Sequence, residues 1–197
     1  MKFDPSTVQT RWASPMGEMC LAASSRGLAG VWFLNQQHLP DHLNGPTAWP
    51  RINAGKLTHP VLQQAIQQLT DYFAGQRQTF ELPLDINGGT LFQQSVWQAL
   101  SKIPYGVSST YGDVSRQIGN PKAVRAVGAA VGRNPISLIV PCHRVLGSDA
   151  SLTGYAGGLD RKIELLTLEG VAFKAQAKPQ PLARPTHQPS PLQATLL

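Results

Sequence analysis

Cysteine is scarce in this chain: Cys20 and Cys142 are the only two among 197 residues. Two cysteines so far apart exclude a disulfide framework and fit a reducing compartment. The 5 histidines show no zinc-site spacing with either cysteine. We therefore expect no metal and no bound cofactor, so that any chemistry must come from the side chains themselves.

Long apolar runs are also absent. Residues 1–6 lack the apolar core of a signal peptide, and no stretch is long enough to cross a bilayer. These absences predict a cytoplasmic protein without membrane contact. Hydrophobic residues still make up 42% of the chain, enough to bury the core of one large domain or two small ones.

Acidic residues are few: 11 Asp and Glu stand against 17 Lys and Arg, a formal net charge of +6. The excess is sharpest between Lys102 and Arg144, where Asp113 is the only acid. A polyanion such as nucleic acid would suit this segment. A solvated basic face is the commoner explanation of so small an excess, so charge alone does not identify a partner.

The first half of the sequence has the alternation typical of strands. An antiparallel meander is predicted over residues 7–13, 19–23 and 28–34. Residues 36–56 lack periodicity and indicate a long loop or an insertion. Apolar residues at helical spacing between Pro60 and Gly75 predict one amphipathic helix, and residues 80–86 predict a last edge strand.

The second half begins after the break at residues 87–89 and is mainly helical. Thr90 and Thr110 each open a capping-box pattern, which predicts two helices. Asn120-Pro121 predicts the start of a third helix that runs through Lys122 to about Gly132. The last two form a helix-turn-helix candidate. At 100° per residue, its inward face is Val124, Val127, Gly128 and Val131, and its outward face is Lys122, Arg125, Ala126 and Ala129.

The apolar run 137–140 predicts a short buried strand that ends at Pro141. Cys142 then lies in a turn next to His143 and Arg144. A free cysteine is usually a small core residue, which is our interpretation of Cys20. For Cys142 the neighbouring cationic groups favour the reactive thiolate instead.

The last predicted helix follows the glycine-rich loop 148–158, buries Leu159, Ile163 and Leu166, and ends near Glu169. A carboxylate in a final helical turn opposes the helix dipole and needs a partner, for which we expect His143. The alternative is a solvated glutamate. A cysteine, a histidine and an acid together make an activated nucleophile suited to acyl or alkyl transfer.

Four motifs occur in order: Gly119 to Gly128, Asn134-Pro135, Pro141-Cys142-His143-Arg144-Val145 and Leu168-Glu169-Gly170. With them the chain resembles the O6-alkylguanine-DNA alkyltransferases, or methylated-DNA-protein-cysteine methyltransferases, most densely over residues 90–173. The resemblance implies an α/β (α+β) fold. Residues 1–88 would form an antiparallel sheet with a helix, ribonuclease H-like, and residues 89–173 a mostly helical, winged-helix-like domain with the helix-turn-helix.

The resemblance also implies a reaction. Cys142 would accept the alkyl group of O6-methylguanine, or of O4-methylthymine, irreversibly and once per molecule. His143 would act as a base through a water and Glu169 would orient it. Tyr111 would give a proton to the departing guanine, and Asn134 would hold the reactive turn.

The remaining implied roles concern binding. The carbonyl of Val145 and the loop residues Tyr155, Ala156 and Gly157 would hold the base after it leaves the stack. Arg125 would fill the vacated position in double-stranded alkylated DNA, approached as a monomer through the minor groove. The residues expected beside it on the DNA are Lys122, Ala126, Ala129 and Thr110.

Other functions remain open at this stage. A non-catalytic helix-turn-helix regulator or a sensor of alkyl damage would explain the basic helix but not the Cys-His-Glu combination. A cysteine hydrolase would explain that combination but not the helix-turn-helix. Residues 174–197 contain five prolines and no acid, and we expect this tail to be disordered.

Overall fold

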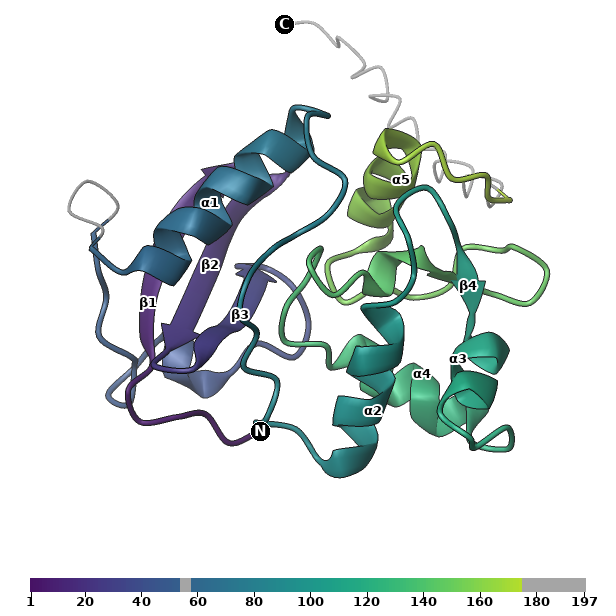
Figure 1. The fold of residues 1–197 in the computed structure, drawn as a ribbon, viewed down its shortest axis with the longest axis horizontal. Coiled ribbons are helices and arrows are strands. Elements are labelled where there is room, and N and C mark those ends of the chain that lie inside the picture. The colour runs from purple at the N-terminus through teal and green to yellow at the C-terminus, as the bar shows by residue number, and fades with distance from the viewer. Residues whose placement is uncertain (54–57, 175–197) are drawn as a thin grey trace, which may run out of the picture.

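The computed structural model describes residues 1–53 and 58–174, so the expectation about the proline-rich tail falls, apart from Lys174, outside the described residues. The chain forms two halves that lie side by side (Figure 1). A three-stranded sheet covered by one long helix makes up the first half, and a group of shorter helices makes up the second. No helix among the described residues is long and apolar enough to cross a membrane.

The sheet is the predicted antiparallel meander, in the order β1-β2-β3. Its strands are β1 (Val8–Ser14), β2 (Gly17–Ser24) and β3 (Gly27–Phe33). Gly27 has a φ of +146°, and a Cβ there would lie 2.4 Å from the carbonyl oxygen of Pro83. The turn between β2 and β3 therefore requires glycine. Cys20 is fully buried in β2, which confirms its structural interpretation.

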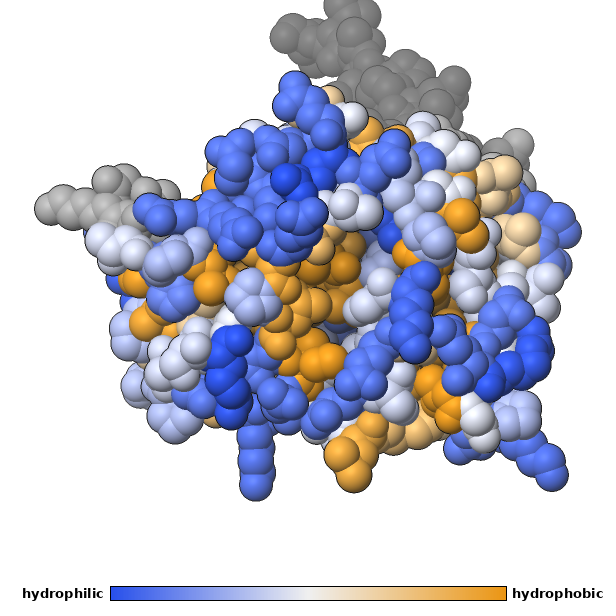
Figure 2. All heavy atoms as spheres, viewed as in Figure 1, coloured by the Kyte–Doolittle hydropathy of each residue, from blue (hydrophilic) through white to orange (hydrophobic). Residues whose placement is uncertain are grey.

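Helix α1 (Pro60–Phe73) packs on one face of the sheet. Pro60 occupies the start of the helix, where its missing N–H has no intrahelical partner to lose. The buried side chains recur at helical spacing and are Leu62, Ala65, Gln68, Leu69 and Tyr72. Figure 2 shows mainly hydrophilic side chains over the outer surface of α1, as expected for the solvent-facing side of an amphipathic helix.

The predicted edge strand over residues 80–86 is wrong. The segment runs beside β3 and forms a single isolated bridge, between Leu28 and Leu84. The N–H of Leu28 donates to Pro83 O and the N–H of Asp85 donates to Leu28 O. Pro83 has no N–H of its own, so the ladder cannot continue through it. The described part of the predicted loop, residues 36–53, contains a short 3-10 helix, η1 (Asp41–Leu43).

Both predicted capping boxes are present, at Thr90 and at Thr110. In each, the threonine hydroxyl accepts the N–H of the residue three positions later, and that residue's side chain accepts the threonine N–H. They open the first two helices of the second half, α2 (Leu91–Leu100) and α3 (Tyr111–Gln117). Two short parallel strands, β4 (Ser109–Thr110) and β5 (Val145–Leu146), pair beside them.

Helix α4 (Val124–Gly132) begins later than the Asn-Pro pattern predicts. The N–H of Ala123 donates to Asn120 O, which closes a turn ahead of the helix and places Lys122 in that turn. The inward face is also shifted: Val124 is 40% exposed, whereas Ala130 is buried. Residues 120–123 form a turn and not the first helical turn that a start at Pro121 implies. The buried face of α4 therefore differs from the one predicted by counting 100° per residue from Pro121.

The strand predicted over residues 137–140 does not form, although the segment is buried as expected. Leu138 has a positive φ of 69°, and the N–H of Val140 donates to Ile136 O, which makes tight turns. Just before them, Pro135 O accepts from Val31 N and Val31 O accepts from Ser137 N, so the segment is attached to β3.

Helix α5 (Leu159–Leu168) is present, but its buried face differs from the prediction. Leu159 and Ile163 are 36% and 37% exposed. The side chains that point inward are Lys162, Leu165 and Leu166. The prediction considered only apolar residues as candidates for burial and therefore left out Lys162. For this reason the predicted buried face is rotated around the helix axis relative to the observed one.

Candidate active site

Cys142 begins a short 3-10 helix, η3 (Cys142–Arg144), directly after the turns of residues 137–140. Its side chain is only 5% exposed. It lines a cavity of about 460 Å³, together with Tyr111, Val131, Tyr155 and Ala156 among others. This volume lies within the range of small-molecule sites and would hold a purine base. The thiol thus borders a partly open cavity and is itself almost fully buried.

Asn134 holds the turn that carries Cys142. Its Nδ2 donates to Val140 O at 2.7 Å and to Cys142 Sγ at 3.1 Å, and its Oδ1 accepts the N–H of Ile136 at 3.0 Å. Both N–H donors and the carbonyl oxygen of the amide are thus used in a buried setting, so the position of the sulfur is closely defined.

The electrostatics of Cys142 differ from the sequence-based expectation. Burial raises the pKa of the thiol, and the hydrogen bond from Asn134 and the charge of Lys162 act in the opposite direction. Arg144, the cation expected to favour the thiolate, is paired with Glu169 instead. The resting thiol is therefore protonated and needs a base before it can attack.

His143 and Glu169 form the contact predicted from the sequence. The Nε2 of His143 lies 2.9 Å from Oε1 of Glu169, and both side chains are fully buried. Burial lowers the pKa of His143 and outweighs the opposing effect of Glu169, so the imidazole is neutral near pH 7. A neutral imidazole that donates from Nε2 keeps Nδ1 as an acceptor. Nδ1 is buried and has no hydrogen-bond partner among the described residues, so it is available to take a proton.

Glu169 is surrounded by donors that the sequence did not indicate. Arg144 donates from Nε to Oε2 at 2.7 Å and from Nη2 to Oε1 at 2.9 Å, and the hydroxyl of Tyr72 donates to Oε1 at 2.7 Å. Burial would raise the pKa of the Glu169 carboxyl, but the hydrogen bonds from His143 and Arg144 lower it to about 2. The carboxylate is therefore charged at every physiological pH.

Tyr111 and the loop residues meet at the cavity. The hydroxyl of Tyr111 lies 2.9 Å from Oγ1 of Thr153. Burial raises the pKa of Tyr111, so its hydroxyl keeps its proton. Tyr155 and Ala156 line the cavity, while Gly157 follows them in the loop. The structure thus brings the predicted proton donor and most of the predicted loop to the same space as the thiol.

Lys162 is a buried cation that sequence reasoning missed. Its Nζ donates to Val145 O at 2.6 Å and to Thr153 O at 3.2 Å. Burial lowers its pKa to about 8, against the attraction of Cys142. The carbonyl of Val145, which was expected to receive a base, already accepts one hydrogen bond here. A carbonyl oxygen has a second lone pair, which leaves room for another donor.

The loop that borders the cavity is tied to the first half of the chain. Arg161 donates from Nε to Met16 O at 2.9 Å and from Nη1 to Gly157 O at 2.8 Å, and its guanidinium lies 4.2 Å from the centre of the Phe33 ring. Gln37 N donates to Ala156 O at 2.9 Å. These contacts fix the loop on the sheet of the first half.

Helix α4 connects the cavity to the surface. Gly128, Val131 and Gly132 line the cavity. On the other side of the helix, Arg125, Ala126 and Ala129 are exposed, as predicted, and so is Lys122 in the preceding turn. Thr110 is the N-cap of α3 and uses its side chain for that cap. The exposed face of α4 is small and basic, and the thiol lies behind it.

Comparison with known proteins gives two family matches that together cover most of the chain. Residues 8–86 match the ribonuclease-like domain of the 6-O-methylguanine DNA methyltransferases, and residues 91–171 match their DNA-binding domain. The chain belongs to the 6-O-methylguanine DNA methyltransferase family. The mixed α/β fold, with an N-terminal antiparallel sheet and a helical DNA-binding part, is the fold of this family.

Two curated relatives illustrate the membership, both named methylated-DNA--protein-cysteine methyltransferase. The Methanosarcina acetivorans protein is 46% identical over 157 residues, which are 80% of this chain and 94% of the relative. The constitutive Bacillus subtilis protein is 44% identical over 164 residues, 82% of this chain and 94% of the relative. A crystal structure of Mycobacterium tuberculosis OGT in complex with DNA superposes with a TM-score of 0.73 at 42% identity, over 83% of this chain and 92% of that one.

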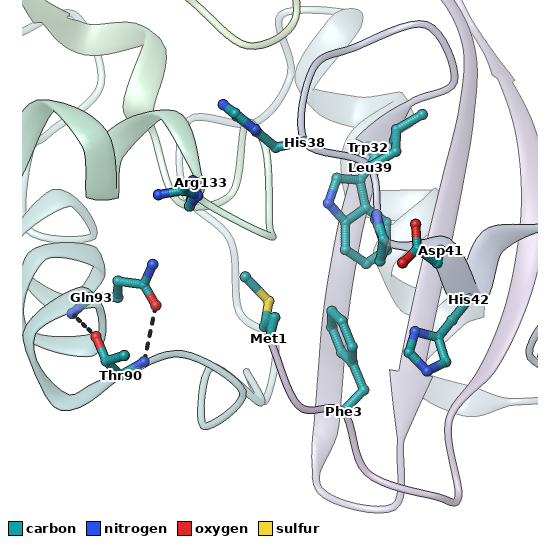
Figure 3. Close-up of a pocket in the computed structure, with 11 residues that line it drawn as sticks. Met1, Phe3, Trp32, His38, Leu39, Asp41, His42, Thr90, Gln93 and Arg133 are labelled. Carbon is teal, nitrogen blue, oxygen red and sulfur yellow. Dashed lines mark hydrogen bonds between the residues drawn. The ribbon is translucent and has the colours of Figure 1, made fainter.

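This methyltransferase-family chain has a second cavity of about 460 Å³, between the two halves (Figure 3). Thr90, Gln93 and Arg133 border it on one side, and Phe3, Trp32 and His42 on the other. It contains no cysteine, and the capping box between Thr90 and Gln93 is closed by its own hydrogen bonds. Cys142 lines the first cavity and not this one.

Proposed function

We propose that this protein repairs DNA by direct reversal, transferring the alkyl group from O6 of guanine to Sγ of Cys142. The observation that carries the proposal is the position of Cys142, whose thiol lines a base-sized cavity with the His143–Glu169 pair behind it. Residues 1–88 would form the supporting domain, and residues 89–173 the domain that binds DNA and accepts the alkyl group.

The reaction would be a single displacement. His143 takes the thiol proton through an intervening water, since its buried Nδ1 makes no hydrogen bond to Cys142 or to another described residue. The thiolate attacks the O6 alkyl carbon, so a carbon–sulfur bond forms as the carbon–oxygen bond breaks. Tyr111 gives its proton to N3 of the departing guanine and regains one from the imidazolium through solvent. Glu169 holds the imidazole throughout.

The product of this reaction is a thioether on the protein. Nothing in the proposed chemistry cleaves the new carbon–sulfur bond, so each molecule would react once and no cofactor would be required. The same displacement would apply to O4-methylthymine, which presents an equivalent carbon–oxygen bond. The enzyme would be a methylated-DNA-protein-cysteine S-methyltransferase with a single turnover.

The target base must leave the duplex, because an O6 carbon inside the stack cannot reach a thiol that is 5% exposed. Base flipping costs a few kcal/mol, and a side chain inserted in the vacated place offsets part of that cost. Arg125 lies on the exposed face of α4, where Ala126 and Ala129 add only small side chains. We propose that a monomer lays this face in the minor groove, with Lys122 and Thr110 toward the phosphates.

The test is a duplex that contains one O6-methylguanine. Mass spectrometry should find one added methyl group per chain, on the peptide that carries Cys142, with no further turnover. Cys142→Ala should abolish transfer, and Cys20→Ala is the matched control because Cys20 is buried in the sheet, away from the cavity. Transfer that survives Cys142→Ala would exclude the proposed acceptor, and duplex binding without transfer by the wild-type chain would favour a damage sensor.

A further inference from the structure

Tyr72 joins the two halves of the chain at the candidate active site. It lies near the end of α1, in the first half, and is fully buried. Its hydroxyl donates to Oε1 of Glu169 at 2.7 Å, across 97 positions in sequence. The ring is fixed by neighbours: the Phe73, Phe80 and Tyr105 ring centres lie 5.4, 5.4 and 6.2 Å away. The hydroxyl therefore has a defined direction.

The carboxylate of Glu169 accepts four hydrogen bonds, and they are unevenly divided. Oε2 accepts one, from Nε of Arg144. Oε1 accepts three, from Tyr72, His143 and Nη2 of Arg144. Tyr72 and His143 thus share one oxygen, and each donor reduces the negative charge that the other encounters.

Tyr72 can act only as a donor in this position. Burial raises the pKa of its hydroxyl, and the charge of Glu169 raises it further. The hydroxyl is therefore protonated over the whole range in which the protein is folded. Arg144 is held at a third point by Ile103 O, at 2.6 Å from Nη1, so it cannot easily rotate to replace a lost donor.

We propose that Tyr72 is a positioning residue for alkyl transfer, which keeps His143 neutral and correctly oriented by sharing Oε1 of Glu169 with it. The inference rests on the proposed function. It makes the first half of the chain a contributor to the acceptor chemistry, in addition to a support for the fold. The hydroxyl does not touch the substrate; it acts on the base through the acid.

The proposal gives a direction for Tyr72→Phe. Without the hydroxyl, Oε1 carries more negative charge toward His143 and stabilises the imidazolium. His143 is then protonated at a higher pH. The acid limb of the pH profile, where the transfer rate falls as His143 gains its proton, should therefore move to higher pH. A hydrogen bond contributes about 1 kcal/mol, so transfer on that limb should slow by about five-fold, while the rate on the alkaline plateau changes little.

Tyr105→Phe is the matched control. Tyr105 packs against Tyr72 at the same place, but its hydroxyl donates to the backbone carbonyl of Leu168 at 2.9 Å and not to the carboxylate. Both variants delete one part-buried or buried hydroxyl and keep the ring. A role in folding alone would lower the unfolding midpoint of both and leave both pH profiles at the wild-type position.

The experiment measures single-turnover transfer from O6-methylguanine duplex between pH 5 and 9 for the wild type, Tyr72→Phe, Tyr105→Phe and Glu169→Gln, with and without Tyr72→Phe. We expect the acid limb to move to higher pH for Tyr72→Phe and to keep the wild-type position for Tyr105→Phe. The shift caused by Tyr72→Phe should disappear in the Glu169→Gln background, where the shared charge is absent. A wild-type chain that transfers one equivalent while Tyr72→Phe keeps the wild-type limb would overturn the inference and leave the function standing. A wild-type chain that transfers nothing would overturn the function.

A second measurement does not depend on activity. The titration of the His143 ring can be followed by NMR in the free protein, with the Tyr105→Phe chain as reference. His143 should gain its proton at a higher pH in Tyr72→Phe than in the wild type. The same titration in both proteins would contradict the proposal even if the transfer rates differed.

Discussion

The side-chain amide of Asn134 donates to the sulfur of Cys142 at 3.1 Å and to Val140 O at 2.7 Å. One residue thus sets both the position of the nucleophile and the turn that carries it. Hydrogen bonding to the sulfur favours the thiolate, in opposition to burial, which disfavours it.

Asn134→Ala should slow alkyl transfer by about 10- to 100-fold, because a hydrogen bond to a charged group contributes roughly 1.5–3 kcal/mol. Single-turnover rates on duplex substrate measure the loss. The pH dependence of Cys142 alkylation by iodoacetamide should move to higher pH in the variant. Thermal unfolding separates this effect from a collapse of the turn, and an unchanged alkylation profile would show that Asn134 acts on the turn alone.

Glu169→Gln should destabilise the protein at pH 7 by roughly 3–5 kcal/mol, because it leaves the buried Arg144 without its counter-charge. The pKa of Glu169 is about 2 in the folded chain and 4.5 as its ordinary value. A lowered carboxyl pKa stabilises the fold above the ordinary value, and this stabilisation is lost as the pH falls from 4.5 toward 2. Urea unfolding at pH 7, 4 and 3 measures the free energy of unfolding of both proteins. The difference between wild type and variant should therefore become smaller as the pH falls. A difference in the free energy of unfolding that stays constant with pH would contradict the assigned ion pair between Arg144 and Glu169.

Arg161→Ala should loosen the loop that carries Tyr155 to Gly157, because Arg161 binds Met16 O and Gly157 O and packs on Phe33. Hydrogen exchange of the loop amides should increase, and transfer should slow by about 10-fold as the cavity loses its border. Arg77→Ala is the control, since Arg77 pairs with Asp71 on the surface of the first half. Equal exchange in both variants would show that the loop is held without Arg161.

Arg125→Ala should slow repair of duplex DNA more than reaction with free O6-methylguanine, because only the duplex requires the stack to be filled. Equal slowing with both substrates would refute this role. Ala129→Leu provides a second test, since a bulky side chain on the exposed face of α4 should keep DNA from approaching the backbone of the helix closely. Its duplex affinity should fall by at least about 10-fold, with reaction of the free base unchanged.

Local patterns in the sequence predicted much of this structure. The capping boxes at Thr90 and Thr110 satisfy backbone donors within a few residues, so they form wherever the helix does. The pairing of His143 with Glu169 was predictable because a carboxylate at a helix end needs a partner. Each of these depends on the residues themselves and little on the rest of the fold.

The errors arise where distant contacts determine the local structure. Leu138 takes a positive φ because Asn134 binds Val140 O and closes the turn, which apolar periodicity cannot show. Sequence reasoning did not single out Lys162, whose ammonium group donates to Val145 O and Thr153 O in the interior. Tyr72 belongs to the row of apolar residues on the inward face of α1, which is sufficient to account for its burial. Nothing in the sequence therefore indicated its hydrogen bond to Glu169.

The burial of Cys142 has a consequence for the lifetime of the molecule. A protein that reacts once loses its function at the first modification of its acceptor, whatever the reagent. Oxidants and dissolved electrophiles act on exposed thiolates, and this thiol is 5% exposed with a pKa that burial raises. The burial of the thiol therefore acts as a chemical safeguard that keeps each molecule available until a damaged base arrives.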